Sequence, residues 1–278
     1  MKNITVNLFE KETEYGFMPS LTTYLLYKYK KDEEELRPAV LVLPGGGYFY
    51  KEPAEGERVA LSYNAAGFHA FVLDYCVEPH IHPYPLLSAA KAMETIRKNA
   101  KEWNVNPDMI AVCGFSAGGH LAATLSNLWN DSSVFPGTKE ENLIYRPNAS
   151  VLCYPVITSG EFAHRNSIKR ISGSEVPCDL WEELSMEKRA NSETPPTFLW
   201  HTFKDASVPV ENSLMYATAL RQSGVPFEMH IYPDGDHGLV LGSDITYWGV
   251  DRFTRSYPWV KQSVEWLYLQ FGITSVEK

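Results

Sequence analysis

The chain has 278 residues, of which 44% are hydrophobic and 21% charged, values typical of a globular protein with one sizeable core. Its formal net charge of −9 would repel phosphate backbones and anionic lipid surfaces. Composition and charge therefore predict a single domain over residues 1–278, and exclude nucleic acid and membranes as main partners in favour of a small molecule.

The first residues, MKNITVNLFEKETEYG, carry charges at Glu10 and Lys11 and lack the apolar core of a secretory signal peptide. No run approaches the roughly 18 apolar residues that a membrane-spanning helix needs. We therefore expect a cytoplasmic protein, and leave open whether it forms a homo-oligomer. The cysteines lack metal or redox spacing and are expected to be buried reduced thiols, with a disulfide as the weaker alternative; they are Cys76, Cys113, Cys153 and Cys178.

Eight runs rich in β-branched and aromatic residues predict eight strands. They cover residues 4–9, 21–29, 39–43, 69–75, 109–115, 150–154, 197–201 and 227–232. The first two alternate polar and apolar residues and should form an antiparallel pair at a sheet edge. The later runs are almost wholly apolar, as parallel strands covered on both faces should be.

Helical patterns separate the later strands, most clearly over 85–103, where apolar residues recur at three- and four-residue spacing. Gly67 and Gly224 follow two further helical stretches, where a left-handed residue commonly ends a helix. A last helix is expected over 259–271. This alternation predicts an α/β fold, a three-layer sandwich around a mostly parallel eight-stranded sheet, with functional sites beyond the carboxyl ends of the strands.

Two connections are longer than joining two elements requires, namely residues 127–148 and 157–195. Loops of this length often carry function. Both segments are therefore candidate lids over a site.

A serine stands between glycines in GFSAGGH, residues 114–120, directly after the apolar strand MIAVC and before the helical run HLAATLSNLW. The glycines allow a tight strand-to-helix turn that holds the hydroxyl of Ser116 at the head of the helix, where developing negative charge is favoured. This context predicts a nucleophile. The alternative is an ordinary glycine-rich turn with an exposed serine.

Three glycines, residues 45–47, follow Pro44 after the strand AVLVL. Amides without side chains could bind the oxyanion of a tetrahedral intermediate there. The alternatives are a plain turn or a phosphate-binding loop, although neither G-x-G-x-x-G nor a following Lys-Ser or Lys-Thr is present. The next residues, Tyr48, Phe49 and Tyr50, are candidate walls of a substrate site, with packing as the alternative.

A serine nucleophile needs a general base, and the base needs a partner that fixes its tautomer. His237 lies in DGDHG just past the last predicted strand, and Asp205 lies just past the strand before it. Ser116, Asp205 and His237 thus follow three different strands at what should be one edge of the sheet. Asp234 and Asp236 are weaker candidates for the acid, because they are too close to His237 in sequence to approach its far nitrogen well.

The other histidines fit the role of base less well. His120, on the same predicted helix as Ser116, is better suited to structural support, and His201 and His230 lie inside strands, where core hydrogen bonds are expected. His80 and His82 form an H-x-H pair without further ligands at recognisable spacing. We therefore predict neither a metal nor a cofactor.

Six stretches together resemble the α/β-hydrolase esterases grouped with carbohydrate acetylesterases and acetylxylan esterases, including bacterial proteins labelled sugar hydrolases. They are LPGGGY (43–48), PYPLLSAAKA (83–92), GFSAGGHLAA (114–123), YPVITSG (154–160), PPTFLWHTFKDASVPVENSL (195–214) and YPDGDHGL (232–239). The resemblance covers most of the chain and implies the α/β-hydrolase fold. It also implies a triad of Ser116, Asp205 and His237, with an oxyanion hole from the backbone of Ala117 and of Gly46 or Gly47. Related lipases place a histidine before the three glycines, whereas Pro44 stands here, a departure that bears on the entrance of the acyl pocket.

These residues predict a serine esterase that removes small acyl groups, acetyl above all, from carbohydrate esters. The alternatives are a general short-chain carboxylesterase, a serine peptidase of the same fold, and a non-catalytic hydrolase-like binding protein. Peptidase relatives usually carry an extra N-terminal propeller domain, for which 278 residues leave no room. The expected partner is a small-molecule ester such as an acylated sugar.

Overall fold

A computed structural model describes residues 3–28, 36–241 and 258–273. Within these ranges eight strands form one sheet, as predicted. They are β1 (Thr5–Asn7), β2 (Ser20–Tyr24), β3 (Arg37–Leu43), β4 (His69–Asp74), β5 (Val105–Phe115), β6 (Ala149–Cys153), β7 (Thr197–Thr202) and β8 (Phe227–Tyr232). The α-helices are α1 (Glu57–Ala65), α2 (Tyr84–Lys98), α3 (Ala100–Trp103), α4 (Ala117–Leu128), α5 (Lys139–Asn142), α6 (Arg165–Ser172), α7 (Asp179–Glu183), α8 (Glu211–Gln222) and α9 (Trp259–Gln270). Three short 3-10 helices are η1 (Pro53–Glu55), η2 (Leu143–Tyr145) and η3 (Met186–Lys188).

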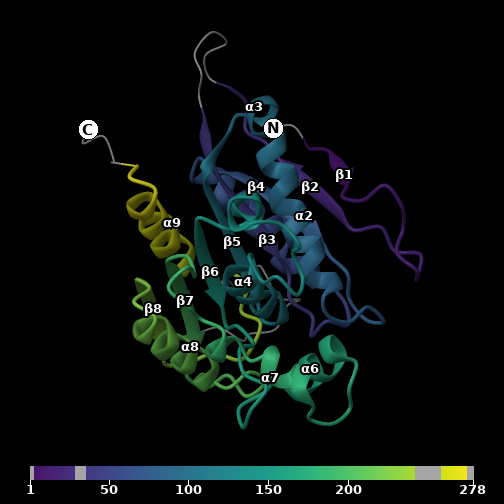
Figure 1. The fold of residues 1–278 in the computed structure, drawn as a ribbon. Helices are drawn as coiled ribbons and strands as arrows, with labels where there is room; N and C mark the ends of the chain where they lie inside the picture. Colours follow the sequence, from purple (N-terminus) through teal and green to yellow (C-terminus); the bar gives the residue numbers. More distant parts are fainter. Residues whose placement is uncertain (1–2, 29–35, 242–257, 274–278) are drawn as a thin grey trace.

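The sheet has the strand order β1-β2-β4-β3-β5-β6-β7-β8. β2 is antiparallel to both of its neighbours, β1 and β4, and every other adjacent pair is parallel. The mostly parallel sheet with an antiparallel pair at one edge is therefore confirmed (Figure 1). The carboxyl ends of β5, β6, β7 and β8 consequently lie along one edge of the sheet.

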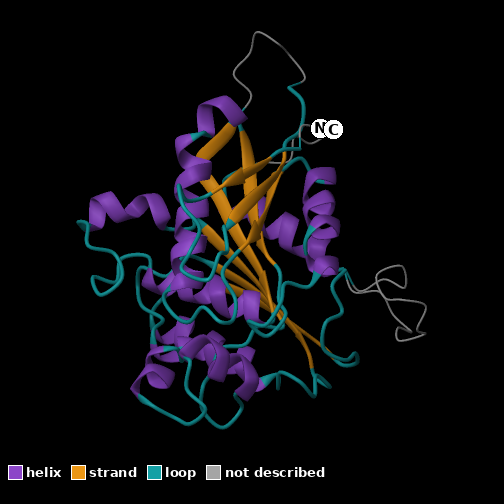
Figure 2. Cartoon of the chain, turned by 90° about the vertical axis from the view of Figure 1, so that its right-hand side faces the viewer, coloured by secondary structure: helices purple, strands orange, loops and turns teal. Residues whose placement is uncertain are grey.

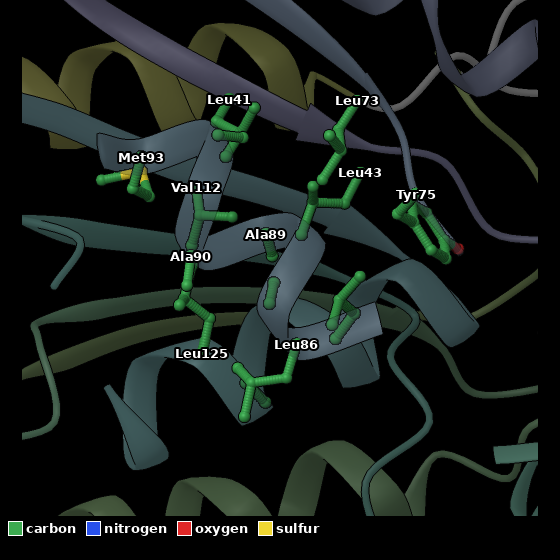
Figure 3. Close-up of a cluster of buried hydrophobic side chains, with 14 of the residues drawn as sticks. Leu41, Leu43, Leu73, Tyr75, Leu86, Ala89, Ala90, Met93, Val112 and Leu125 are labelled. Atoms are coloured by element: carbon green, nitrogen blue, oxygen red, sulfur yellow. The ribbon is translucent and has the colours of Figure 1, made fainter. Parts of the chain in front are cut away.

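Helices cover both faces of the sheet, which gives the predicted three layers (Figure 2). Successive residues of one strand point to opposite faces, and β3 shows how this divides the core. Leu41 and Leu43 pack with residues of α2, α4 and α8, whereas Val40 and Val42 pack with residues of α1 and α9. Figure 3 shows the first of these clusters, in which side chains of α2 and α4 lie against Leu41 and Leu43. Continuous apolar runs such as residues 39–43 are thus explained by burial on both faces.

The helix predicted over 85–103 is two helices, α2 and α3, which are separated at Asn99. The Asn99 side chain donates to the Thr95 carbonyl oxygen at 2.8 Å. The Asn99 N–H donates to the same oxygen at 3.1 Å, and the break appears in the backbone of Asn99, whose φ of −98° and ψ of 9° depart from helical values. The left-handed residues predicted after α1 and α8 are confirmed, since φ is +88° at Gly67 and +73° at Gly224.

The cysteines are free, and three of them are buried as expected. The prediction is wrong for Cys178, which is exposed because it lies in a surface segment just before α7. Of the helices that the structure describes, none has the length and apolar character required to cross a bilayer.

The two candidate lid segments have different surroundings. Residues 143–148 are held against α2 by the guanidinium of Arg97, and none of residues 127–148 lines the cavity beside Ser116. Residues 157–195 include α6, whose side chains do line that cavity. Movement of either segment as a lid stays a prediction.

Arg97 is expected to be a main determinant of stability outside the apolar core. Its guanidinium donates to the carbonyl oxygens of Pro107, Ile144 and Arg146 and to the side chain of Asn148. Arg97→Met keeps most of the aliphatic stem but leaves these acceptors without a donor, so the free energy of unfolding should fall by about 2–4 kcal/mol. Urea denaturation measures it, with the exposed Arg221 of α8 changed to Met as control. If the free energy of unfolding falls by the same small amount in both variants, Arg97 is not a main determinant of stability.

Candidate active site

Ser116 occupies a strained turn between β5 and α4. Its backbone has φ of 52° and ψ of −117°, a conformation that is rare for a residue with a side chain. Three hydrogen bonds hold it, since its N–H donates to Cys153 and its carbonyl oxygen accepts from His120 and Val156, each at 3.0 Å. The serine side chain is therefore fixed at the carboxyl end of β5, as the glycine pattern predicted.

Two of the glycines in this turn pack too closely for any side chain. A Cβ atom on Gly114 would lie 2.2 Å from the Gly118 carbonyl oxygen, and one on Gly119 would lie 2.8 Å from Cβ of Pro155. Both contacts are shorter than real Cβ contacts. The glycines thus allow the first turn of α4 to fold back against β5 and the segment after β6.

The structure brings the three predicted residues into one hydrogen-bonded series. Nε2 of His237 lies 2.8 Å from Oγ of Ser116, and Nδ1 of His237 lies 2.6 Å from Oδ2 of Asp205. One ring nitrogen therefore faces the hydroxyl while the other faces a carboxylate, so that the carboxylate can fix the tautomer in which Nε2 accepts the serine proton. The catalytic roles of these residues stay a prediction, which is taken up below.

Asp205 is held as a buried anion. Its Oδ1 accepts from the N–H groups of Ser207 at 3.0 Å and Val208 at 2.8 Å, and its Oδ2 lies 3.3 Å from Nε2 of His201. Burial alone would raise the pKa of Asp205, but the interactions with His201 and His237 and the backbone donors outweigh it and hold the pKa well below its ordinary value. The carboxylate facing His237 is thus ionised at neutral pH.

Neither alternative acid is the residue that Nδ1 of His237 contacts, which is Asp205. Asp234 and Asp236 are exposed, and the carboxylate of Asp234 pairs with Lys204. Asp205 is therefore the acid that geometry selects among the three considered.

The predicted oxyanion donors lie on both sides of Ser116. Ala117 is the first residue of α4, where the amide has no acceptor within the helix. Gly46 and Gly47 line the same cavity as Ser116, with φ of +118° and +64°. The amide of Gly45 points elsewhere, since it donates to Oε2 of Glu55 at 2.6 Å. These contacts leave Gly46 and Gly47 as the candidate donors of the loop.

The cavity beside Ser116 and His237 has a volume of about 370 Å³. Phe49 lies on its wall with 60% of its surface exposed, and Tyr50 lines it as well. The prediction of a substrate contact is wrong for Tyr48, which is 1% exposed and whose hydroxyl lies 2.8 Å from Nδ1 of His120. Its positive φ of 58° turns the side chain into the core, so for Tyr48 the packing alternative holds.

Several residues of this cavity were not predicted from the sequence. His164, Asn166 and Arg170 line it from α6 and the residue before it, and the Arg170 guanidinium lies 5.0 Å from the centre of the Phe49 ring. Glu55 also lines the cavity, although it is only 3% exposed. No spacing rule marks these residues, because they come from a long connection and from a charged stretch that reads as solvated surface.

Two of the competing histidines have the structural roles expected of them. His120 is buried between Tyr48 and the Leu184 carbonyl oxygen, and burial lowers its pKa to about 4. His201 contacts Ser213 and the Val208 carbonyl oxygen in the core. The prediction of a core role is wrong for His230, which is partly exposed beside Glu228 because β8 is an edge strand. Among the residues described, no three His, Cys, Asp or Glu side chains gather as a metal site requires.

A family model and solved structures of known proteins both match this chain. Residues 26–220 match the family model BD-FAE. A solved structure, an acetyl ester-xyloside bifunctional hydrolase from Caldicellulosiruptor lactoaceticus, is 39% identical, with a TM-score of 0.82 over 98% of this chain and 97% of that one. A carboxylesterase from Lactobacillus plantarum is 26% identical, with a TM-score of 0.83 over 99% of this chain and all of that one.

Two curated relatives carry xylan-related names. Endo-1,4-beta-xylanase B of Butyrivibrio fibrisolvens is 36% identical over 86% of this chain, and the acetylxylan esterase of Xylanibacter ruminicola is 32% identical over 75%. The matched regions span only 37% and 42% of the length of these two relatives. The matched family model, the solved relatives and the observed sheet agree, and the chain belongs to the BD-FAE family of α/β-hydrolases.

Proposed function

We propose that this chain is a serine carboxylic-ester hydrolase that removes small acyl groups, acetyl above all, from carbohydrate esters. The observation that carries the proposal is the series from Asp205 through His237 to Ser116, with contacts of 2.6 and 2.8 Å. A hydroxyl, an imidazole and a buried carboxylate in this order are what nucleophilic acyl transfer requires.

In the proposed reaction, Oγ of Ser116 attacks the ester carbonyl carbon while Nε2 of His237 takes the hydroxyl proton. The amides of Ala117 and of Gly46 or Gly47 bind the oxyanion, and Asp205 stabilises the imidazolium. His237 then gives its proton to the departing alcohol oxygen, which leaves the acyl group on Ser116. A water molecule then attacks the acyl carbon while His237 takes one of its protons. The bond between the acyl carbon and Oγ of Ser116 breaks, His237 returns the proton to Oγ, and the carboxylic acid leaves.

The carbohydrate part of the proposal is supported by the character of the cavity wall. The lining combines hydrogen-bonding groups on Glu52, His164 and Asn166 with the exposed rings of Phe49 and Tyr50. Sugars present hydroxyls at their edges and apolar C–H groups on their faces, so a wall of this kind suits them. The names of the xylan-related relatives point to the same class of substrate.

The second candidate function is a general short-chain carboxylesterase. The similarity to the carboxylesterase from Lactobacillus plantarum over the whole chain favours it. The chemistry at Ser116 would be the same, and only the alcohol and acyl preferences would differ.

Replacing Ser116 with Ala should lower kcat for p-nitrophenyl acetate by at least about 10⁴-fold, because no nucleophile remains, while the melting temperature stays near that of the wild type. Ser62→Ala on α1, outside the cavity, serves as the control. The wild type is also assayed on p-nitrophenyl butyrate and octanoate and on acetylated xylo-oligosaccharides. The proposal is supported if hydrolysis depends on Ser116, is fastest for the acetyl ester and extends to the acetylated sugars. Faster hydrolysis of the longer acyl esters supports the general carboxylesterase. Retained activity in Ser116→Ala would refute both.

Asp205→Asn should lower kcat by about 10²–10⁴-fold, because the amide cannot stabilise the imidazolium or fix the reactive tautomer. Since the pKa of Asp205 lies well below its ordinary value, the wild-type carboxylate is charged at both about pH 6 and pH 8. Removing this charge makes the imidazolium of His237 less stable and moves the acid limb to lower pH, so the defect should be smaller at about pH 6 than at about pH 8. Asp234→Asn is the matched control and should change kcat by less than about twofold. Steady-state kinetics at both pH values measure kcat. An equal loss of kcat in the two variants would contradict the role given to Asp205.

Phe49→Ala should raise KM for acetylated xylo-oligosaccharides by about 3- to 10-fold, the loss expected for one aromatic contact, with little change for p-nitrophenyl acetate. The control is Phe203→Ala, an aromatic side chain that is 68% exposed but lies outside the cavity lining. Equal KM changes on both substrates would show that Phe49 does not contact the sugar.

A further inference from the structure

A second carboxylate, Glu55, lies in the active-site cavity without a part in the chemistry described so far. It is the last residue of η1 and is 3% exposed, yet it lines the same cavity as Ser116 and His237. A Cβ atom on Gly45 would lie 2.8 Å from Oε2 of Glu55 and 3.0 Å from Cβ of Ser116. Glu55 and Ser116 thus both lie against the glycine loop at Gly45.

Both oxygens of Glu55 are bound, each by a different part of the site. Oε2 accepts from the Gly45 N–H at 2.6 Å, and Oε1 accepts from the Tyr154 hydroxyl at 2.7 Å. The same hydroxyl accepts from the Val240 N–H at 3.1 Å, three residues after His237. One continuous set of hydrogen bonds therefore runs from the glycine loop to the histidine loop.

Tyr154 is buried and contacts His237 directly. It follows β6 with φ of +36°, is 1% exposed, and donates its N–H to the Trp200 carbonyl oxygen at 2.8 Å. The edge of one ring meets the face of the other, with centres of Tyr154 and His237 5.0 Å apart. Displacing the Tyr154 hydroxyl would therefore shift the surroundings of the imidazole.

We propose that Glu55 is a positioning residue, which holds the oxyanion loop and the histidine loop in their relative places through Gly45 and Tyr154 and places a second negative charge near His237. The inference rests on the proposed function and deepens it. The bridge aligns the amides of residues 46 and 47 with Ser116, and its charge favours the imidazolium that forms when Ser116 attacks.

A carboxylate in this place has a cost to stability. Burial raises the pKa of Glu55 to about 7, although the donors Tyr154 and Gly45 and the proximity of His237 act in the opposite direction. Five titratable groups interact with the charge of Glu55, namely Glu52, Tyr75, Cys153, Tyr154 and His237. Because the folded-state pKa exceeds the unfolded value, this group stabilises the fold below about pH 4.5 and loses that contribution as the pH rises to about 7.

The test combines Glu55→Gln, which keeps the shape and removes the charge, with Glu55→Ala and Tyr154→Phe, which break the bridge. Ser116 reactivity is read as the rate of labelling by a fluorophosphonate probe, followed by intact-protein mass spectrometry, together with kcat and KM for p-nitrophenyl acetate. We expect kcat to fall about 10-fold in Glu55→Gln and Tyr154→Phe and about 100-fold in Glu55→Ala, with KM changed less than about threefold. Matched controls are Glu187→Gln, a partly buried carboxylate of η3, and Tyr216→Phe, a buried phenol that donates to Asn127.

Three further readouts separate positioning from a general loss of structure. Glu55→Gln should move the acid limb of kcat/KM to lower pH, because a negative charge near the imidazole is gone. Its melting temperature relative to wild type should rise between about pH 5 and pH 8, since the buried charge is no longer formed. The double variant Glu55→Gln/Tyr154→Phe should lose less activity than the product of the single losses, because both act through one bridge.

Each outcome has a distinct meaning. The inference would be overturned if the Glu55→Gln and Tyr154→Phe proteins fold, label Ser116 within twofold of the wild-type rate and keep the wild-type pH profile. Should Glu55→Ala not fold, the other two variants still decide. A wild-type protein that neither labels nor hydrolyses esters would instead refute the proposed function itself.

Discussion

The close approach of α4 to the end of β3 is the constraint on which the site depends. A Cβ atom on Gly118 would lie 2.1 Å from the Leu43 carbonyl oxygen and 2.5 Å from that of Pro44, so only glycine allows this contact. Because Ser116 immediately precedes α4 and the glycine loop follows Leu43 and Pro44, the contact holds the proposed nucleophile and the proposed oxyanion loop side by side. Their relative position is thus set by backbone packing in the core, which is dense and resists deformation.

The parallel sheet supplies the second requirement, which is a common edge. Ser116, Asp205 and His237 follow β5, β7 and β8, and three strand spacings of about 4.8 Å separate β5 from β8, roughly 14 Å in all. The loop after β8 must therefore fold back across β7 and β6 to reach the serine. Two hydrogen bonds fasten it there, from the Thr202 hydroxyl to the Gly235 carbonyl oxygen and from the Val240 N–H to the Tyr154 hydroxyl.

Sequence reasoning succeeded where chemistry and local structure coincide. Glycines around Ser116 are needed at specific backbone positions, and Asp205 and His237 lie in the loops after β7 and β8. Parallel strands that end at one edge of the sheet therefore predict that the three residues lie at the same edge. It failed where a role is set by distant contacts. Glu55 lies in the charged stretch KEPAEGER, and nothing local indicates that folding buries it under Tyr154, a residue 99 positions away. The neighbours Tyr48 and Phe49 are equally aromatic, and only a backbone turn with positive φ sends one inward and the other to the cavity.

The two carboxylates near the imidazole of His237 differ in pKa because they accept hydrogen bonds from different donors. Asp205 receives two backbone N–H groups and faces His201 as well as His237, which outweighs its burial and lowers its pKa. Glu55 receives one N–H and one phenol, so burial dominates and its pKa rises to about 7. At neutral pH the site therefore holds one fixed negative charge and one that titrates. The titratable cation whose charge acts on Glu55 is the imidazolium of His237, so the charge that costs stability here is placed to favour the protonated base.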